Sequence, residues 1–310
     1  MPDILTVTLN PAIDIAANVT RLEARGKLRC HAPHIDPGGG GVNVSRAIKE
    51  LGGDSLAFVA VGGPIGDWYV ELLNSEGVNA VQFEIGGHTR QSFAVTEEET
   101  GEQYRFVLPG PTWSKDESER ALAEIIALSE NKSYIVLSGS LPPGAPDDFY
   151  SRIAASIPNK ITRVVLDTSA AALTTSVKKS TKSFYCIRMN TREAQQFGKS
   201  LFAETDATSL AKALVDRQVA EVVIVTHGEK GAVLATQNLS LSITPPQVKV
   251  VSAVGAGDSF VGAFTLGMSK NWSLRAACRY GVAAAASAMT TPATVLCQKD
   301  KVLRYLSKIQ

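Results

Sequence analysis

The segment Lys249–Phe264 reads KVVSAVGAGDSFVGAF and places a glycine turn between two different hydrophobic patterns. After the turn, apolar residues recur at Phe260, Phe264 and Met268, which is the spacing of one helix face. Before the turn, β-branched residues predict a strand, at Val248, Val250, Val251 and Val254. The glycines are therefore predicted to lie in a tight strand-to-helix turn.

The same alternation of strand-like and helix-like segments runs through most of the chain. The strand-like segments are ILTVTL (4–9), SLAFVAVGG (55–63), SYIVLSGS (133–140), RVVLDTS (163–169), FYCIRMN (184–190) and EVVIVTHG (221–228). Helix-like segments lie between them, at 42–52, 67–77, 147–157 and 206–218, and the chain after Asp258 is helical to its end. This pattern predicts an α/β fold in which helices cover both faces of a mostly parallel sheet. No repeat or low-complexity linker divides the chain, so 1–310 is expected to form one domain.

Two segments, about 12–36 and 88–109, interrupt this alternation. In the second, residues 91–96 and 103–108 predict a β-hairpin around the polar turn Glu99-Thr100-Gly101. Neither segment is followed by a helix that could cover it. We expect a small antiparallel flap, or lid, beside the main sheet, and a homodimer that forms through its uncovered apolar face.

The bulk composition favours no charged macromolecule as a partner. The chain has 31 basic and 30 acidic residues and a formal net charge of +1, so nothing points to nucleic acid or to an anionic membrane. The four cysteines lack the paired spacing of a zinc site and are interpreted as reduced thiols. No leader-like N-terminus and no membrane-length apolar run is present. A cytoplasmic protein is expected.

Four glycines, Gly38 to Gly41, precede a helix that contains Asn43. Such a run lets a ligand approach the backbone closely, and the free N–H groups at a helix start favour anionic or hydroxyl-bearing ligands. A flexible loop is the alternative interpretation of the same residues.

The turn at Gly255, Ala256, Gly257 and Asp258 is a second candidate site. Its backbone N–H groups could stabilise the charge of a phosphoryl group in transfer, and the Asp258 carboxylate could take a proton from an attacking hydroxyl. An aspartate at a helix start is also a common N-cap, and the segment alone favours that role. The spacing matches neither a P-loop nor a dinucleotide fingerprint.

Two further motifs follow strands. In VTHGEKGAV, Thr226, Gly228 and Gly231 could hold a nucleotide phosphate or form a plain glycine hairpin. In RMNTREA, Asn190 and Glu193 are three residues apart. That spacing suits a hydrated magnesium ion and also a helix capping box, and it does not separate the two.

The flap segments carry four cations without a compensating acidic cluster on the same flanks: Lys27, Arg29, Arg90 and Arg105. Charges on exposed strands usually protect a sheet edge. The arginines would equally suit a phosphorylated substrate, because a guanidinium supplies forked donors.

The order of these motifs resembles the phosphofructokinase B branch of the ribokinase-like sugar kinases, nearly from end to end. GGGGVNV, SGSLPPG at 138–144, Asn-x-x-Glu, Thr-x-Gly-x-x-Gly and GAGDSF follow one another. GKLRCHAP (26–33), TRQ (89–91) and GEQYRFVLPG (101–110) are similar to the minor bacterial 6-phosphofructokinase group in particular. Relatives that act on fructose 1-phosphate or tagatose 6-phosphate typically carry a lysine within the glycine run, which this chain lacks.

The resemblance implies ATP-dependent phosphorylation of the 1-hydroxyl of fructose 6-phosphate. It implies that Asp258 is the base, that residues 255–258 form an anion hole, and that the flap closes over the sugar. By the matching motifs, sugar hydroxyls would contact Asp14, Gly38, Gly39 and Asn43, with Ser140 nearby. The 6-phosphate would contact Arg90, Lys27, Arg29 and Arg105, and Lys27 could also reach the transferred phosphoryl group. The nucleotide side would include Arg188, Asn190, Thr226, Gly228, Gly231 and Ser252, and Glu193 with Asn190 would organise Mg²⁺ through water.

Three residues depart from the family pattern, all on the ATP side. Arg188 and Met189 stand where relatives usually have Lys-Pro, Ala253 stands where a small polar or branched residue is usual, and Ala293 replaces a common glycine. Two alternatives to a fructose 6-phosphate kinase stay open. One is a kinase for tagatose 6-phosphate or a related ketose phosphate, because epimers differ too subtly for the sequence to separate them. The other is a sugar-phosphate-binding protein that has lost phosphoryl transfer, because of the three ATP-side departures.

Overall fold

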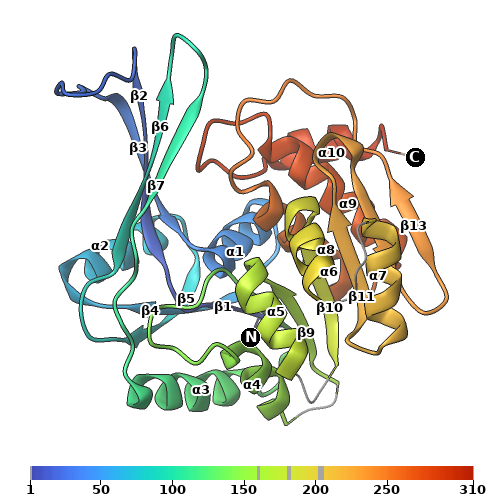
Figure 1. Cartoon of the computed structure of the whole chain (residues 1–310). Coiled ribbons are helices and arrows are strands. Elements are labelled where there is room, and N and C mark those ends of the chain that lie inside the picture. Colours follow the sequence, from blue (N-terminus) through green and yellow to red (C-terminus); the bar gives the residue numbers. More distant parts are fainter. Residues whose placement is uncertain (1, 159–160, 180–182, 202–205, 310) are drawn as a thin grey trace.

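The structure is a computed structural model that describes residues 2–158, 161–179, 183–201 and 206–309 (Figure 1). Within these residues the main sheet has nine strands in the order β13-β12-β11-β10-β9-β8-β1-β4-β5. Seven neighbouring strands run parallel: β1 (Ile4–Thr8), β4 (Leu56–Val61), β5 (Asn79–Glu84), β8 (Tyr134–Ser138), β9 (Arg163–Asp167), β10 (Phe184–Asn190) and β11 (Ala220–Thr226). The last two, β12 (Ala232–Ala235) and β13 (Ser240–Ile243), continue the sheet as antiparallel strands. The predicted α/β fold with a mostly parallel sheet is confirmed.

Helices cover both faces of this sheet. One face packs against α3 (Lys115–Ser129), α4 (Phe149–Ser156), α5 (Ala170–Lys179), α6 (Thr191–Leu201) and α7 (Ala207–Asp216). The other packs against α1 (Gly40–Glu50), α2 (Gly63–Ser75), α8 (Ala256–Ser269), α9 (Leu274–Ala288) and α10 (Lys299–Leu306). Among the described helices, none combines the length and the apolar character needed to span a membrane.

The strand order reverses at β1, which has β4 on one side and β8 on the other. In open α/β sheets, ligands bind beyond the carboxyl ends of the strands at such a point, because the connecting loops diverge there. In this chain the loops concerned follow Thr8 and Ser138. They fix the position of the candidate site.

A second sheet of four strands, in the order β3-β2-β6-β7, forms the predicted lid. Its strands are β2 (Ala12–Val19), β3 (His31–Gly38), β6 (Arg90–Glu97) and β7 (Gln103–Val107). The predicted hairpin is confirmed, because β6 and β7 pair antiparallel. The two hairpins join through β2 and β6, which run parallel. Figure 1 shows the lid rising away from the main sheet.

The strand predicted just before Asp258 is wrong. Residues 244–254 form an irregular segment that pairs with no strand of the described residues. Pro245 and Pro246 lie just beyond Thr244, the first residue after β13, and have no N–H groups to extend a ladder. Val250 and Val251 are 42% and 56% exposed, so their β-branched side chains do not mark a buried strand. The glycine turn therefore joins a loop to α8.

The glycine run at 38–41 is not a flexible loop. Gly39 is the N-cap of α1 with φ 120°, and Gly40 and Gly41 belong to the helix. A Cβ at Gly41 would lie 2.5 Å from the carbonyl oxygen of Val7, and one at Gly40 would lie 2.6 Å from the backbone nitrogen of Gly139. The glycines thus let α1 begin directly against the ends of β1 and β8.

Candidate active site

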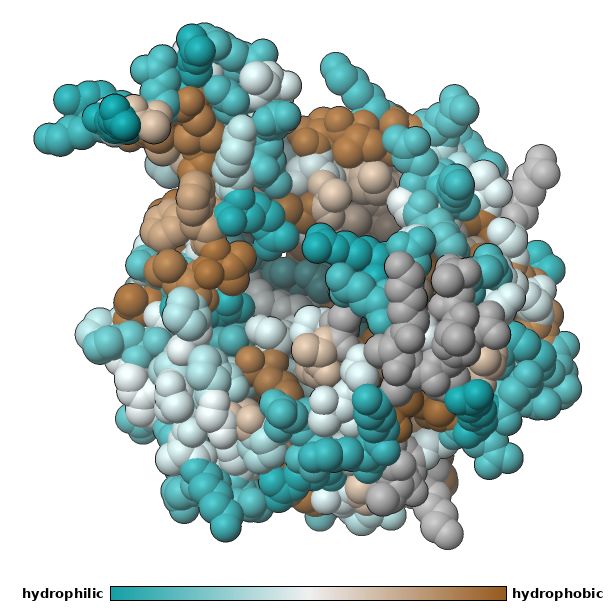
Figure 2. Space-filling view, in the orientation of Figure 1, coloured by the Kyte–Doolittle hydropathy of each residue, from teal (hydrophilic) through white to brown (hydrophobic). Residues whose placement is uncertain are grey.

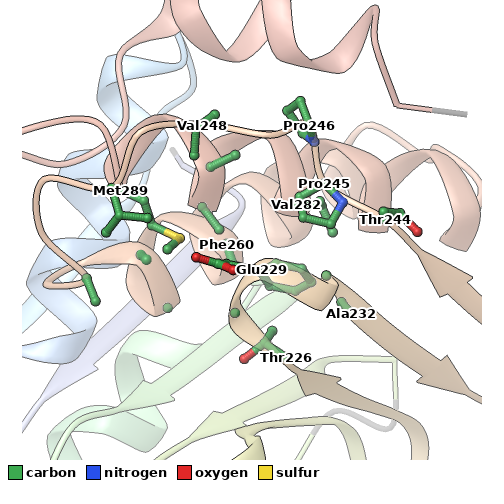
Figure 3. Close-up of a pocket in the computed structure, with 18 of the residues that line it drawn as sticks. Thr226, Glu229, Ala232, Thr244, Pro245, Pro246, Val248, Phe260, Val282 and Met289 are labelled. Atoms are coloured by element: carbon green, nitrogen blue, oxygen red, sulfur yellow. The ribbon is translucent and has the colours of Figure 1, made fainter.

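Loops at the carboxyl ends of the strands enclose a cavity of about 690 Å³. Figure 2 shows the surface hollowed between the lid and the part of the molecule that carries α8. In Figure 3, Pro246, Val248 and Met289 lie toward one end of the cavity and Thr226 toward the other. An elongated cavity with an apolar end and a polar end suits a ligand that joins a flat apolar group to a charged one.

Asp258 is not an N-cap, contrary to the role that its own segment favours. The N-cap of α8 is Gly255, in the left-handed conformation with φ 73°, and no side chain caps the helix. The Asp258 carboxylate instead accepts a hydrogen bond from Nδ2 of Asn43, at 2.9 Å. Arg46 Nη1 donates to Asn43 Oδ1 at 3.3 Å, which leaves the Asn43 amide nitrogen for Asp258. The contact joins α1 to α8.

The surroundings of Asp258 bring the pKa of its carboxylate close to neutrality. Burial raises its pKa from 3.8 to about 7, and the negative charges of Asp167 and Asp14 act in the same direction. The Asn43 hydrogen bond and the Arg188 charge oppose that rise. A carboxylate whose pKa lies near neutrality can accept a proton and still be ionised before reaction.

Arg188 lies against the glycine turn. Its Nη1 donates to Asp167 at 3.2 Å and its Nη2 donates to the Thr226 hydroxyl at 2.6 Å. A Cβ at Gly257 would lie 2.6 Å from Nη1, so only glycine allows this close approach. Its Nε is buried and has no partner among the described residues. The structure thus brings the predicted residues Arg188 and Thr226 together beside the glycine turn that is predicted to form an anion hole.

Asp167 was missed by the sequence analysis. It ends β9, is 8% exposed, and lies within 3.5 Å of the Ser138 hydroxyl as well as beside Arg188. The only signal was an aspartate at the end of a buried strand in RVVLDTS. Its partner depends on a tertiary contact 21 residues along the chain.

Asn190 and Glu193 form a reciprocal cap at the start of α6. Glu193 N donates to Asn190 Oδ1 at 2.9 Å, and Asn190 N donates to Glu193 Oε2 at 2.8 Å. The capping-box alternative is therefore confirmed as a structural role. Burial raises the pKa of Glu193, and Asp167 adds to that rise. The described residues contain no group of three or more metal-ligating side chains.

The glycine hairpin alternative at VTHGEKGAV is confirmed, and the same residues line the cavity. The short 3₁₀ turn η1 (Gly228–Lys230) connects the antiparallel strands β11 and β12. Thr226, Gly228 and Gly231 all face the 690 Å³ cavity. A hairpin and a nucleotide-binding loop are thus compatible.

The remaining ATP-side residues are placed differently. Ser252 is buried, accepts a hydrogen bond from Val254 N and is not among the residues that line the cavity. Ala253 lines the cavity, while Ala293 is buried outside its lining. Of the three departures from the family pattern, Arg188 and Ala253 therefore face the cavity.

On the sugar side, Asp14 packs over the end of β3. A Cβ at Gly38 would lie 2.0 Å from its carboxylate, so Gly38 is required there. Burial raises the pKa of Asp14 to about 6, against the opposing charges of Arg105 and Arg90. The structure thus groups Asp14 with two of the predicted phosphate-binding cations.

Lys27 and Arg29 are not part of this group within one chain. Both are exposed and lie in the loop that joins β2 to β3. Figure 1 shows that loop at the far end of the lid, away from α8. Their predicted contacts with the 6-phosphate and with the transferred phosphoryl group stay predictions.

Residues 5–301 match the family described as pfkB family carbohydrate kinase. An ATP-dependent 6-phosphofructokinase isozyme 2 of Mycobacterium tuberculosis is 40% identical over 305 residues, which is 98% of this chain and 89% of that protein. The protein of the same name from Escherichia coli is 37% identical over 312 residues, which is 99% of this chain and 100% of that one.

Solved structures of carbohydrate kinases are also similar to the chain. Phosphofructokinase-2 from Escherichia coli in complex with substrates and products superposes with a TM-score of 0.91 at 35% identity, covering 98% of each chain. A ribokinase from Thermotoga maritima, at 20% identity, has a TM-score of 0.77, covers 99% of this chain and 100% of its own, and shares the fold.

Proposed function

The chain belongs to the pfkB family of carbohydrate kinases, and we propose that it transfers the γ-phosphoryl group of ATP to the 1-hydroxyl of fructose 6-phosphate, giving fructose 1,6-bisphosphate. The names of its 37–40% identical relatives support this acceptor. One observation carries the proposal: the Asn43–Asp258 hydrogen bond sets a carboxylate of raised pKa beside the backbone N–H groups of the glycine turn. A base next to an anion hole is what phosphoryl transfer to a hydroxyl requires.

In the proposed reaction, the oxygen of the sugar 1-hydroxyl forms a bond to the γ-phosphorus of ATP. Asp258 accepts the proton that this hydroxyl loses. The bond from that phosphorus to the bridging oxygen breaks, and ADP leaves with the electron pair. The N–H groups at 255–258 and the Arg188 guanidinium stabilise the negative charge during transfer. Asp14, Gly38, Gly39 and Asn43 orient the sugar, and Arg90 with Arg105 attracts its phosphate.

The 690 Å³ cavity suits ATP, because it offers an apolar end for the base and a polar end for the phosphates. The base would lie at the apolar end near Val248 and Met289, and the phosphates near Thr226 at the other end. Arg188 lies at that same end, because it donates a hydrogen bond to Thr226. Arg188 Nε, buried without a partner among the described residues, could donate there. The presence of this cavity favours a kinase over the alternative of a sugar-phosphate-binding protein that has lost phosphoryl transfer.

Mg²⁺ is proposed as the metal, held mainly by ATP phosphates and water. Without a three-ligand cage in the described residues, the site suits an ion that keeps several waters, as Mg²⁺ does. The buried Glu193 carboxylate, with Asn190, would orient those waters. The ion would supply charge neutralisation for the phosphates. We propose a cytoplasmic location, because ATP and sugar phosphates are metabolites of that compartment.

A substrate panel tests the proposed acceptor. With Mg-ATP, kcat/KM for fructose 6-phosphate is expected to exceed that for tagatose 6-phosphate by about tenfold or more, since a misplaced hydroxyl leaves a polar group unpaired. Fructose 1-phosphate has no free 1-hydroxyl and is expected not to be phosphorylated at that position. Unphosphorylated fructose serves as the control for the phosphate contacts. A higher kcat/KM for tagatose 6-phosphate would replace this acceptor with that alternative.

We further propose that two copies associate through the lid. Tyr104, Phe106, Val107 and Leu108, on or just after β7, are 38–57% exposed in a single chain. Large side chains of this kind on an edge strand favour burial against a second copy. Structures of the Escherichia coli protein include one described as a tetrameric inhibited form.

Phe106→Glu is expected to convert the dimer to a monomer and to lower kcat/KM, measured by sedimentation velocity and coupled assay. Leu303→Glu is the matched control, because Leu303 is 51% exposed against 52% for Phe106 but lies on α10. If Phe106→Glu remains dimeric, the interface is elsewhere.

A further inference from the structure

Asn10 forms hydrogen bonds to two residues of the proposed sugar site. It lies in the loop between β1 and β2, at the point where the strand order reverses, and is 9% exposed. Its backbone carbonyl accepts hydrogen bonds from Arg90 Nε at 3.3 Å and Nη2 at 3.1 Å. Its side-chain Nδ2 donates to the Ser140 hydroxyl at 3.1 Å. One residue thus holds a phosphate-binding cation and a hydroxyl from another loop.

The surroundings fix the orientation of the Asn10 amide. Nδ2 also donates to the Leu141 carbonyl at 3.4 Å, and a carbonyl oxygen can only accept. Oδ1 is buried without a partner among the described residues. A Cβ atom added at Gly110 would lie only 2.1 Å from this Oδ1 atom. Gly110 therefore provides the space that the amide needs.

Asn10, Arg90, Leu108 and Leu141 line a second cavity of about 520 Å³, which shares no lining residue with the 690 Å³ cavity. Arg90 is also held from the other side, because its Nη1 donates to the Leu108 carbonyl at 3.0 Å. The charged side chains in its lining are one cation, Arg90, and one carboxylate, Asp147. An anionic group would therefore bind on the side of the Arg90 guanidinium. It is separate from the part of the site assigned to ATP.

We infer that Asn10 is a positioning residue for the phosphate-bearing end of the sugar, acting on Ser140 through its amide and on Arg90 through its carbonyl. The inference rests on the proposed function. Asn10 has no assigned contact with ATP. The Asn10 side chain therefore sets the affinity for the sugar phosphate and does not set the rate of phosphoryl transfer.

Asn10→Ala tests the amide, because it keeps the carbonyl that holds Arg90. We expect the KM for fructose 6-phosphate to rise by up to about tenfold, the upper end of the effect of losing one hydrogen bond between neutral groups. The KM for ATP and kcat are expected to stay within about twofold. Asn10→Asp, of equal size, removes the donor and adds a negative charge beside Arg90, so the same KM should rise about a hundredfold.

Ser140→Ala separates positioning from a general structural role. If Asn10 acts through Ser140, Asn10→Ala should change the KM for fructose 6-phosphate by less than about twofold in the Ser140→Ala background. Independent effects that multiply would overturn the inference. So would equal increases in the KM for ATP and for the sugar phosphate.

Gly110→Ala provides a test that leaves Asn10 in place, should Asn10→Ala fold poorly. The added methyl group displaces Oδ1, and the same selective rise in the KM for fructose 6-phosphate is expected. An unchanged KM would count against the inference. Failure of the proposed function would show separately, as wild-type protein that does not phosphorylate fructose 6-phosphate at all.

Discussion

Asp258→Asn is expected to lower kcat for fructose 6-phosphate by about a thousandfold, the contribution typical of a positioned general base. The amide has the same shape but cannot accept the proton of the 1-hydroxyl. KM values for both substrates are expected to change by less than about threefold, since the hydroxyl and the ATP phosphates keep their other contacts. Steady-state kinetics with a coupled ADP assay measures both quantities. A variant with near wild-type kcat would show that another group accepts the proton.

The pH profile sharpens this prediction. The base must be ionised, so wild-type activity should be present above the Asp258 pKa of about 7 and fall as the pH drops through it. Burial is the main cause of this raised pKa; the charges of Asp167 and Asp14 add to the rise, and the Asn43 hydrogen bond and the Arg188 charge oppose it. Asn43→Ala removes that hydrogen bond and should move the acid limb to higher pH. An unmoved limb would mean that it belongs to another group.

Stability provides the control for folding. Because the folded pKa of Asp258 lies above its unfolded value of 3.8, the folded state binds more protons between these values and loses stability as the pH rises from about 4 to 7. Asp258→Asn abolishes that loss. At pH 8 the variant should therefore unfold at a temperature equal to or above that of the wild type, so its inactivity cannot be ascribed to unfolding.

Arg188→Ala is expected to lower kcat/KM for ATP by about a hundredfold, comparable to the removal of one donor from an anion hole. Arg188→Lys retains the charge but cannot bridge Asp167 and Thr226 with a planar fork, so a smaller loss of about tenfold is expected. An equal loss in the two variants would show that the fork geometry, and not the charge, is decisive.

Arg188→Ala also leaves Asp167 buried without its cation and should lower the unfolding temperature. Adding Asp167→Asn removes the unpaired charge and should restore stability without restoring activity. Recovery of activity in the double variant would mean that Arg188 contributes only to folding. Thermal denaturation and the coupled assay distinguish these outcomes.

The strands and most helices could be predicted because their signals are local. Each parallel strand is a short apolar run, and the helices between them carry the periodic faces that cover the sheet. The lid hairpin was also local, because β6 and β7 are neighbours in the sequence. Its parallel junction with β2 was not, since the paired residues Ala12 and Arg90 are far apart along the chain.

The site could be predicted less fully from the sequence, because its contacts join residues that are far apart along the chain. The segment around Asp258 alone favours a helix cap, whereas the hydrogen-bond partner of its carboxylate, Asn43, lies 215 positions away along the chain. Asp167 and Asn10 carry no motif of their own and gain a role only through tertiary contacts. Val250 and Val251 predicted a strand from composition, whereas no neighbouring strand pairs with them in the described residues.

Phosphorus NMR of the product tests the central claim most directly. Wild-type protein, Mg-ATP and fructose 6-phosphate should give ADP and a ketose that carries phosphate at both the 1- and 6-positions, in equal amounts. ADP with inorganic phosphate alone, or a product phosphorylated at a hydroxyl other than the 1-hydroxyl, would contradict the account.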